Sequence, residues 1–210
     1  MTDQPSAEQG AALAQLRESV SRVEAGDYRS AGPSTQQRPA EPVSDQEDYS
    51  KARAVVLRKL TGSAKSRHQL AQSLRERDFS EEIIATVLDR MEEVQLIDDL
   101  EFARTWVRTR HELKGLGSAA LRRELQERGV DPTDIEGALE QLSAEDEDAA
   151  AAELIANKLR GVSLPVGHGP QERKERDKIT RRLVGMLARR GHSPGAALKL
   201  VREAVESVNH

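Results

Sequence analysis

Apolar residues recur at helical spacing along this chain, and one such pattern occurs three times. If Leu70, Leu121 and Leu183 are placed at a common origin, each copy has another leucine four residues later and an arginine seven residues later. Ten residues after each origin stands a residue suited to begin a helix. The equivalent positions are Leu74, Leu125 and Leu187, then Arg77, Arg128 and Arg190, then Ser80, Asp131 and Ser193. This repetition predicts three tandem helical modules, an architecture that presents repeated faces to a partner.

The first module has the pattern of three helices. Residues 51–60 carry apolar positions on one stripe, and a Thr-Gly-Ser break follows them. Ser66 and Gln69 form a capping box at the start of the second helix, and Ser80 caps the third. We expect order to begin near Tyr49.

The turn residues support the same division in the other two modules. Gly129 and Gly191 stand where the C-terminus of a helix favours a left-handed residue. The helix caps after them are followed by prolines, at a position where a missing N–H costs little. The first module has Asp78 in place of the glycine, which is a tolerated substitute. Each module therefore contains a helix–turn–helix, and the predicted fold is all-α.

These signals give the following boundaries. We expect a disordered acidic extension at residues 1–48, a first three-helix repeat at 49–97, a second at 98–143, and a third at 144–210 that includes a flexible linker at 161–172. Within the extension, residues 11–24 have apolar positions at helical spacing, which suggests a short amphipathic helix.

Composition favours a helical core and excludes several kinds of chemistry. The chain has five aromatic residues and no cysteine, so a core must be built from Leu, Ile, Val and Ala. Without cysteine there are no disulfides, no thiol catalysis and no thiolate metal sites. No apolar run approaches the roughly 20 residues that cross a bilayer, and the start of the chain does not resemble a signal peptide. We therefore expect a soluble cytoplasmic protein.

The charges are sorted along the chain. The net charge of −4 conceals an acidic extension and a remainder in which signs alternate. Residues 51–77 are basic, residues 78–101 are acidic, and residues 171–202 are basic again. Such alternation suits a charged partner that is approached in a defined register, although charged faces can also simply solvate helices.

A helix-turn-helix invites comparison with DNA-binding proteins, in which the second helix of the pair lies in the major groove. Here that helix is acidic in the first two modules, with Glu81, Glu82 and Asp134 among its residues. Phosphates would repel it, so sequence-specific reading of duplex DNA is disfavoured.

Other candidate sites have simpler explanations. The five histidines show no paired ligand spacing, so metal binding is not expected. Residues 114–118 lack the order of a phosphate-binding loop and fit a break between helices. The acidic pair Asp98 and Asp99 fits a helix N-terminus. We therefore expect neither an enzyme nor a cofactor.

A basic cluster in the second module is the preferred contact surface. It contains Arg104, Arg108, Arg110, Lys114, Arg122 and Arg123. Further candidates in the other two modules are Lys51, Arg53, Arg67, Arg181 and Arg182. Trp106 lies one turn after Phe102, and we expect this pair to fill the junction between modules one and two rather than to contact a partner.

Several motifs resemble the RecX family, the regulators of the RecA recombinase. One is Ser66-x-x-Gln69-Leu70-x-x-x-Leu74, followed by Ile84-x-x-Val87-Leu88. Another is Leu96-Ile97-Asp98-Asp99-x-x-Phe102-Ala103, with Arg110 downstream. The third is Lys114-Gly115-Leu116-Gly117, followed by Leu121-x-x-x-Leu125-x-x-x-Gly129-Val130. The resemblance covers residues 50–142 well and 144–207 more loosely. Gln95 and Asp78 stand where the family usually has glycine.

The resemblance implies an elongated, curved string of three-helix modules that docks in the helical groove of the RecA–DNA filament. Such a protein would limit ATP hydrolysis, strand exchange and co-protease activity, and so act in homologous recombination, DNA repair and the SOS response. We expect a monomer whose partner is the filament, with single- or double-stranded DNA contacted weakly or through it. The runner-up is a helical module that binds nucleic-acid phosphates without RecA, and a third candidate is a helical adaptor for some other assembly.

Overall fold

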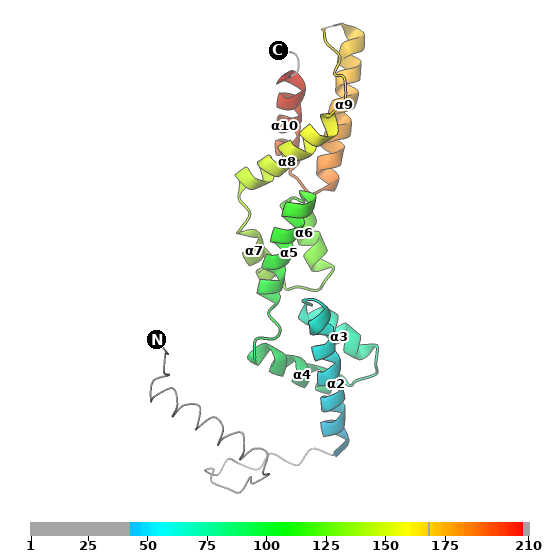
Figure 1. The fold of residues 1–210 in the computed structure, drawn as a ribbon, viewed down its shortest axis with the longest axis vertical. Coiled ribbons are helices and arrows are strands. Elements are labelled where there is room, and N and C mark those ends of the chain that lie inside the picture. The colour runs from blue at the N-terminus through cyan, green and yellow to red at the C-terminus, as the bar shows by residue number, and fades with distance from the viewer. Residues whose placement is uncertain (1–42, 168, 208–210) are drawn as a thin grey trace, which may run out of the picture. The chain divides into compact units, whose positions relative to one another are not determined.

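The computed structural model describes residues 43–167 and 169–207, and all regular structure within these residues is helical (Figure 1). The helices are α2 (Val43–Gly62), α3 (Arg67–Arg75), α4 (Glu81–Glu93), α5 (Asp99–Lys114), α6 (Ser118–Gln126), α7 (Pro132–Leu139), α8 (Ala144–Leu159), α9 (Pro170–Arg189) and α10 (Pro194–Glu206). The all-α prediction is confirmed for this part of the chain. The predicted helix at residues 11–24 and most of the predicted extension lie outside the described residues.

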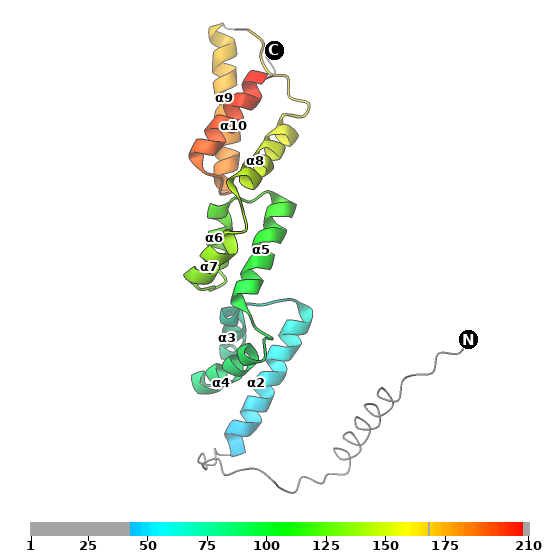
Figure 2. The ribbon, with the colours of Figure 1, turned by 90° about the vertical axis from the view of Figure 1, so that its left-hand side faces the viewer.

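Helices α2, α3 and α4 pack against one another as the first bundle (Figure 2). Val56 from α2, Leu74 from α3 and Leu88 from α4 are buried in its core. The predicted capping box at Ser66 is present, and the Ser80 side chain accepts the N–H of Ile83 at the start of α4. The caps read from the sequence therefore begin both helices.

Helix α2 begins earlier than predicted, at Val43 rather than near Lys51. The Lys51 ammonium lies 2.9 Å from a Glu47 carboxylate oxygen one turn earlier. The Ser50 hydroxyl donates to the Gln46 carbonyl oxygen at 2.9 Å. Tyr49 packs against the first core. These local contacts extend the helix into a stretch whose composition suggested an unstructured tether.

Helices α5, α6 and α7 form the second bundle, and α8, α9 and α10 form the third. Their cores repeat the first, because the residues aligned at the common origin are buried in every bundle: Leu70, Leu121 and Leu183, with Leu74, Leu125 and Leu187. The three predicted modules are thus three bundles that each have their own core.

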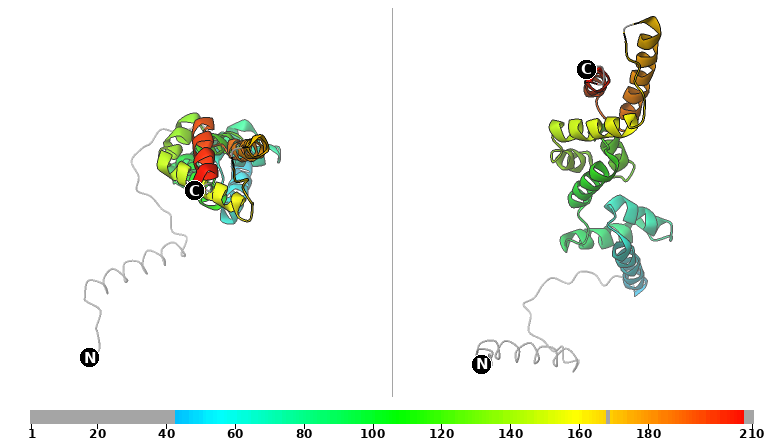
Figure 3. Two further views of the ribbon diagram at one scale, coloured as in Figure 1. Left: turned by 90° about the horizontal axis from the view of Figure 1, so that it is seen from above. Right: turned by 45° about the horizontal axis from the view of Figure 1, so that its top comes forward.

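The insertion in the third module connects α8 to α9 and runs alongside α9 to its first turn (Figure 3). Helix α9 starts at Pro170, so the last three residues of the predicted linker are helical. The guanidinium of Arg176 donates to the carbonyl oxygens of Pro165 and Gly167, at 3.2 and 2.5 Å. Leu164 is buried. The hydrogen bonds of Arg176 therefore hold the connection against α9.

The left-handed turns stand where the sequence placed them. Gly129 has φ +69° and Gly191 has φ +85°. Asp78 takes the same conformation with φ +60°, and Gln95 does so with φ +56°. The two positions at which glycine was absent from the pattern therefore keep the turn and bear the steric cost of a side chain.

The first and second bundles meet where the α2–α3 turn contacts the α6–α7 turn; we call this contact the first joint. The Ser66 hydroxyl donates to the Arg128 carbonyl oxygen at 2.6 Å. The Arg67 backbone N–H donates to Asp99 Oδ1 at 2.8 Å. The His68 side chain lies so close to Gly129 that an added Cβ would come within 2.2 Å of it.

The second joint repeats the first between bundles two and three. The Gly117 backbone N–H donates to the Arg190 carbonyl oxygen at 2.9 Å. An added Cβ on Gly191 would lie 2.2 Å from the Ala120 nitrogen. Gly117 is the repeat equivalent of Ser66, and Arg190 is the equivalent of Arg128. The same two turns therefore meet at both joints.

Charged and polar groups complete the joints. At the second joint the buried His192 ring places Nε2 2.9 Å from the Gly115 carbonyl oxygen, and the Arg190 guanidinium donates to the Lys114 carbonyl oxygen. At the first joint, burial raises the pKa of the Asp99 carboxyl above its ordinary value, although the hydrogen bond from Arg67 acts in the opposite direction. At the first joint, burial therefore outweighs the hydrogen bond in its effect on the pKa of Asp99.

We expect Gly191→Ala to destabilise the protein by about 2–4 kcal/mol, because an L-residue at positive φ is strained and its Cβ would push against the Ala120 backbone. Urea unfolding followed by circular dichroism measures this change. Gly195→Ala is the matched control: nothing lies within 4 Å of its added Cβ, and it should stabilise by about 0.5–1 kcal/mol. Equal stability of the two variants would contradict the close approach at the second joint.

Asp99→Ala should cost about 1–2 kcal/mol of stability, because it leaves the Arg67 N–H without its acceptor, whereas Asp99→Asn keeps an acceptor oxygen and should cost less.

Since the folded-state pKa of Asp99 is raised, the folded protein binds the proton of this carboxyl more tightly than the unfolded chain does. Its contribution to stability therefore falls as pH rises from the ordinary carboxyl range through the raised value. Urea unfolding at a series of pH values from about 4 upward should show this fall as a difference between the parent protein and Asp99→Asn, and the same pH dependence in both would contradict the assignment.

Candidate functional site

The candidate contact residues of the first bundle differ in whether a nearby carboxylate neutralises their charge. Lys51 is paired with Glu47 and lies 3.5 Å from Asp48, and the hydrogen bond to Glu47 raises the pKa of Lys51. Arg53 is exposed and has no ion pair among the described residues. Lys51 is thus engaged within its own helix, and Arg53 is available on the surface.

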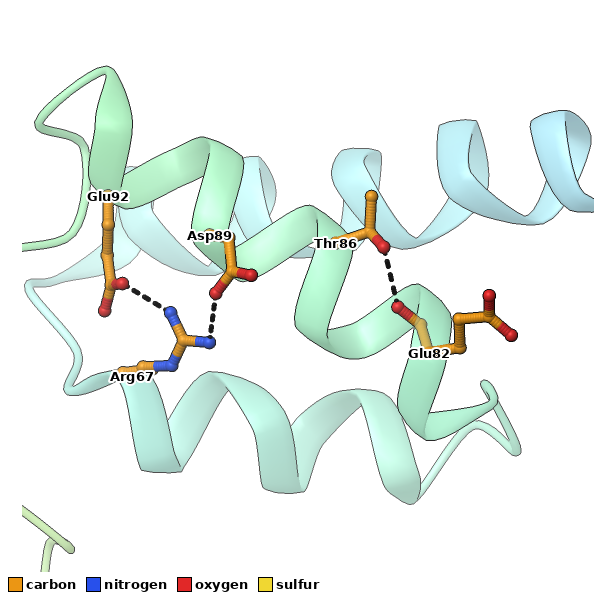
Figure 4. A network of polar contacts seen from close by, with 5 residues as sticks. All are labelled: Arg67, Glu82, Thr86, Asp89 and Glu92. Carbon is orange, nitrogen blue, oxygen red and sulfur yellow. Dashed lines mark hydrogen bonds and ion pairs between the residues drawn. The ribbon is translucent and has the colours of Figure 1, made fainter. Parts of the chain in front are cut away.

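Arg67 has a structural role. Its guanidinium spans from the start of α3 to α4, where it binds Asp89 at 2.6 Å and Glu92 at 2.5 Å (Figure 4). Its backbone N–H meanwhile binds Asp99 at the first joint. One residue therefore fixes α4 against α3 and bundle two against bundle one.

The basic cluster predicted in the second bundle is divided over several faces. Arg104 and Arg108 lie one turn apart on α5 and are exposed, without an ion pair among the described residues. Arg123 is exposed on α6 in the same way. These three arginines have the accessible charge that a partner would meet.

Two other members of the cluster are occupied inside the bundle. Arg122 makes two hydrogen bonds to Glu136 of α7, at 2.7 and 2.8 Å, and they lower the pKa of that carboxyl. Arg110 lies 3.4 Å from Glu124. The structure thus assigns both arginines internal partners, and their contact with another molecule stays a prediction.

Trp106 is surrounded by polar and cationic groups. Its Nε1–H donates to Glu124 at 2.8 Å, and its ring stacks with Phe102 at 6.0 Å between centroids. The guanidinium carbons of Arg110 and Arg128 lie 4.2 and 3.7 Å from the ring centroid. The Trp106 indole thus contacts one carboxylate and two guanidinium groups of the second bundle.

Trp106 also borders a cavity of about 450 Å³ that residues of both bundles line, among them Lys65 and Gln69. Its predicted place at the junction between the first two modules is therefore confirmed. Trp106 and Phe102 do not fill that junction, because the cavity remains between the two bundles.

The remaining candidates lie towards the third bundle. Lys114 is exposed and lines a cavity of about 690 Å³, together with His111, Asp146 and Arg190. Arg181 and Arg182 are exposed on α9, and the Arg181 side chain donates to the Asp177 carbonyl oxygen at 3.2 Å. The eleven candidates thus lie on all three bundles and do not converge on one pocket.

Sequence reasoning missed the residues that join the bundles: Ser66, Asp99, Arg128, Arg190 and His192. A signal for some of them was present, since the arginine seven residues after the origin occurs in all three copies. In the first two bundles its side chain donates to the carbonyl oxygen four residues earlier, from Arg77 to Ser73 and from Arg128 to Glu124. In the third, Arg190 reaches across the second joint instead.

Two other kinds of site are absent from the described residues. No group of three or more metal-ligating side chains that could hold an ion occurs there. None of the helices in residues 43–167 and 169–207 combines the length and apolar character that crossing a membrane requires.

Comparison with known proteins agrees with the repeated architecture. The model of the first three-helix domain of RecX matches residues 52–91, which lie in the first bundle, and the model of the second three-helix domain matches residues 98–139. A crystal structure of regulatory protein RecX superposes with a TM-score of 0.65 at 23% identity, covering 90% of this chain and 87% of that one. The crystal structure of RecX from Lactobacillus salivarius gives 0.61 at 23% identity, over 75% and 97% of the two chains. These two likenesses concern the fold.

Similarity in sequence extends further. The regulatory protein RecX of Streptomyces coelicolor is 43% identical over 203 residues, which is 97% of this chain and 92% of that protein. The regulatory protein RecX of Thermobifida fusca is 42% identical over 159 residues, or 76% and 81% of the two chains. Identity at this level over nearly the whole length, together with three bundles built on one repeat, means that this chain belongs to the RecX family.

Proposed function

We propose that this protein inhibits the RecA recombinase by binding in the groove of the RecA–DNA filament. There it limits ATP hydrolysis, strand exchange and co-protease activity, as a cytoplasmic monomer without catalysis of its own. The observation that carries the proposal is the 43% identity to a regulatory protein RecX over 97% of the chain.

The repeated joints support a repeating partner. Each joint brings together the same two turns, with hydrogen bonds from Ser66 and Gly117 to equivalent carbonyl oxygens. Successive bundles therefore present equivalent surfaces to successive units of an assembly. A filament of identical protomers is such an assembly.

The exposed arginines of the second bundle are the proposed contact surface. Arg104, Arg108 and Arg123 have no internal ion pair among the described residues, so their charge remains available. Arg122 binds Glu136 tightly, and its loss would disturb the contact between α6 and α7. Variants of Arg104 and Arg108 consequently test the surface more cleanly than variants of Arg122.

The decisive measurement is single-stranded-DNA-dependent ATP hydrolysis by the cognate RecA, with this protein added below equimolar amounts. We expect strong inhibition at ratios too low for this protein to cover the DNA. Full hydrolysis at equimolar protein would reject the proposal. Inhibition only at amounts that cover the DNA would favour the alternative, a module that binds nucleic-acid phosphates without RecA.

In the same assay, Arg104→Glu/Arg108→Glu should raise the concentration for half-inhibition by about tenfold or more, since reversing two surface charges against a complementary partner weakens association. The control is Lys199→Glu/Arg202→Glu, which makes the same change in charge on exposed residues of α10. Equal loss in both variants would indicate a nonspecific effect of net charge and would remove this surface from the proposal.

A further inference from the structure

We propose that a cationic groove between α8 and α9 binds the phosphate backbone of nucleic acid directly. The groove belongs to the third bundle and is defined by Lys158, Arg182, Arg189 and Arg190. It goes beyond the RecA proposal, because it requires no RecA for binding, and the two proposals can fail separately.

The groove is a cavity of about 420 Å³ with an unusual lining. Four of its eight lining residues are the basic residues that define it, and the others are Leu154, Asn157, Leu183 and Met186. No carboxylate lines it. In a chain whose net charge is −4, a cavity with four cations and no acid is a local concentration of positive potential.

The charges of this groove are not neutralised from within. Lys158, Arg182 and Arg189 are exposed and form no ion pair among the described residues. Some arginines elsewhere are paired, as Arg75 is with Glu81. Arg190 differs from the other three, because it also donates to the Lys114 carbonyl oxygen at the second joint. The groove thus holds at least three cations ready for an anion.

The groove continues into a basic stripe along α9. Lys174, Lys178, Arg182 and Arg189 share one face, since they stand at helical spacing of four, four and seven residues. This stripe covers about 22 Å of helix. The buried Leu183 and Leu187 point into the core of the third bundle, and Leu183 also borders the groove. Glu175 contacts Lys178 only at 3.5 Å and with both side chains exposed, so it hardly reduces the charge.

Gly185 stands inside this stripe and has no structural reason to be glycine. An added Cβ there would meet only Arg189 Nη1, at 3.5 Å, which is ordinary contact. Its φ is not positive. Glycine inside a helix is destabilising, so its presence calls for another explanation. A missing side chain at the centre of the stripe lets a phosphate strand approach the helix backbone closely.

The groove suits a row of phosphates rather than bases. Guanidinium groups bind phosphate and carboxylate alike with two parallel hydrogen bonds, but the stripe spaces its cations along a line, as phosphates are spaced along a strand. No aromatic side chain lines the cavity, so nothing there would stack on a base. Binding through this groove should therefore show little preference for sequence.

The test is direct binding of the full-length protein, without RecA, to fluorescein-labelled single-stranded oligothymidylate and to a duplex, measured by anisotropy at several salt concentrations. Arg182→Ala/Arg189→Ala should weaken binding about tenfold and make the dependence on salt shallower by about 0.7 per lost contact on the single strand. The matched control is Lys199→Ala/Arg202→Ala, which removes two exposed cations from α10 of the same bundle and should change affinity less than twofold. Thermal unfolding of each variant verifies that it remains folded.

Equal weakening by both double variants would overturn the proposal, because net charge alone would then explain binding. Unchanged DNA affinity in Arg182→Ala/Arg189→Ala would also overturn it. If that variant instead inhibited RecA less well, the groove would contact an acidic protein surface, and the RecA proposal would stand without this one. Loss of DNA binding with full inhibition of RecA would support the groove and separate the two roles.

Discussion

The close approach of two turns at each joint is the constraint on which the arrangement of residues 43–207 depends. A bundle of three short helices has a small core, and its neighbour must come within hydrogen-bond distance of its backbone. This contact requires, on one side, an N-cap residue with a hydrogen-bond donor that its own helix does not use. On the other side it requires a residue without a side chain. Ser66 and Gly117 meet the first requirement, and Gly129 and Gly191 meet the second. The glycines thus serve both a left-handed turn and a close contact.

The basic residues of this protein have two different roles. Arg67, Arg110 and Arg122 are held by carboxylates of neighbouring helices, and they fix those helices against one another. Others, such as Arg104 and Arg182, lie on the surface without an internal ion pair among the described residues. Charge patterning along a sequence counts both kinds equally. Only the positions of the acids in space separate the arginines that hold the fold from those that a partner can reach.

The sequence predicted the fold closely, because caps, left-handed turns and apolar spacing are local signals. Ser80, Asp131 and Ser193 each begin the expected helix. The start of α2 was missed, since pairs such as Glu47 with Lys51 outweighed an unfavourable composition. The joints and the division of the basic cluster could not be predicted. A serine that looks like a simple cap also donates to a carbonyl oxygen 62 residues away, and no local pattern contains that information.

The same geometry limits how many bundles can be added to the series. At Ser66 and Gly117 a helix begins, and each offers a free donor to the next bundle. Ile179 stands at the equivalent position in the third bundle, but it lies inside α9, where its N–H belongs to the helix. At the other side, the first bundle has the side chain of Asp78 where a glycine would be needed. Among the described residues, neither outer surface therefore presents the pair of turns that meets at the two joints, and the series of equivalent contacts ends at the first and third bundles.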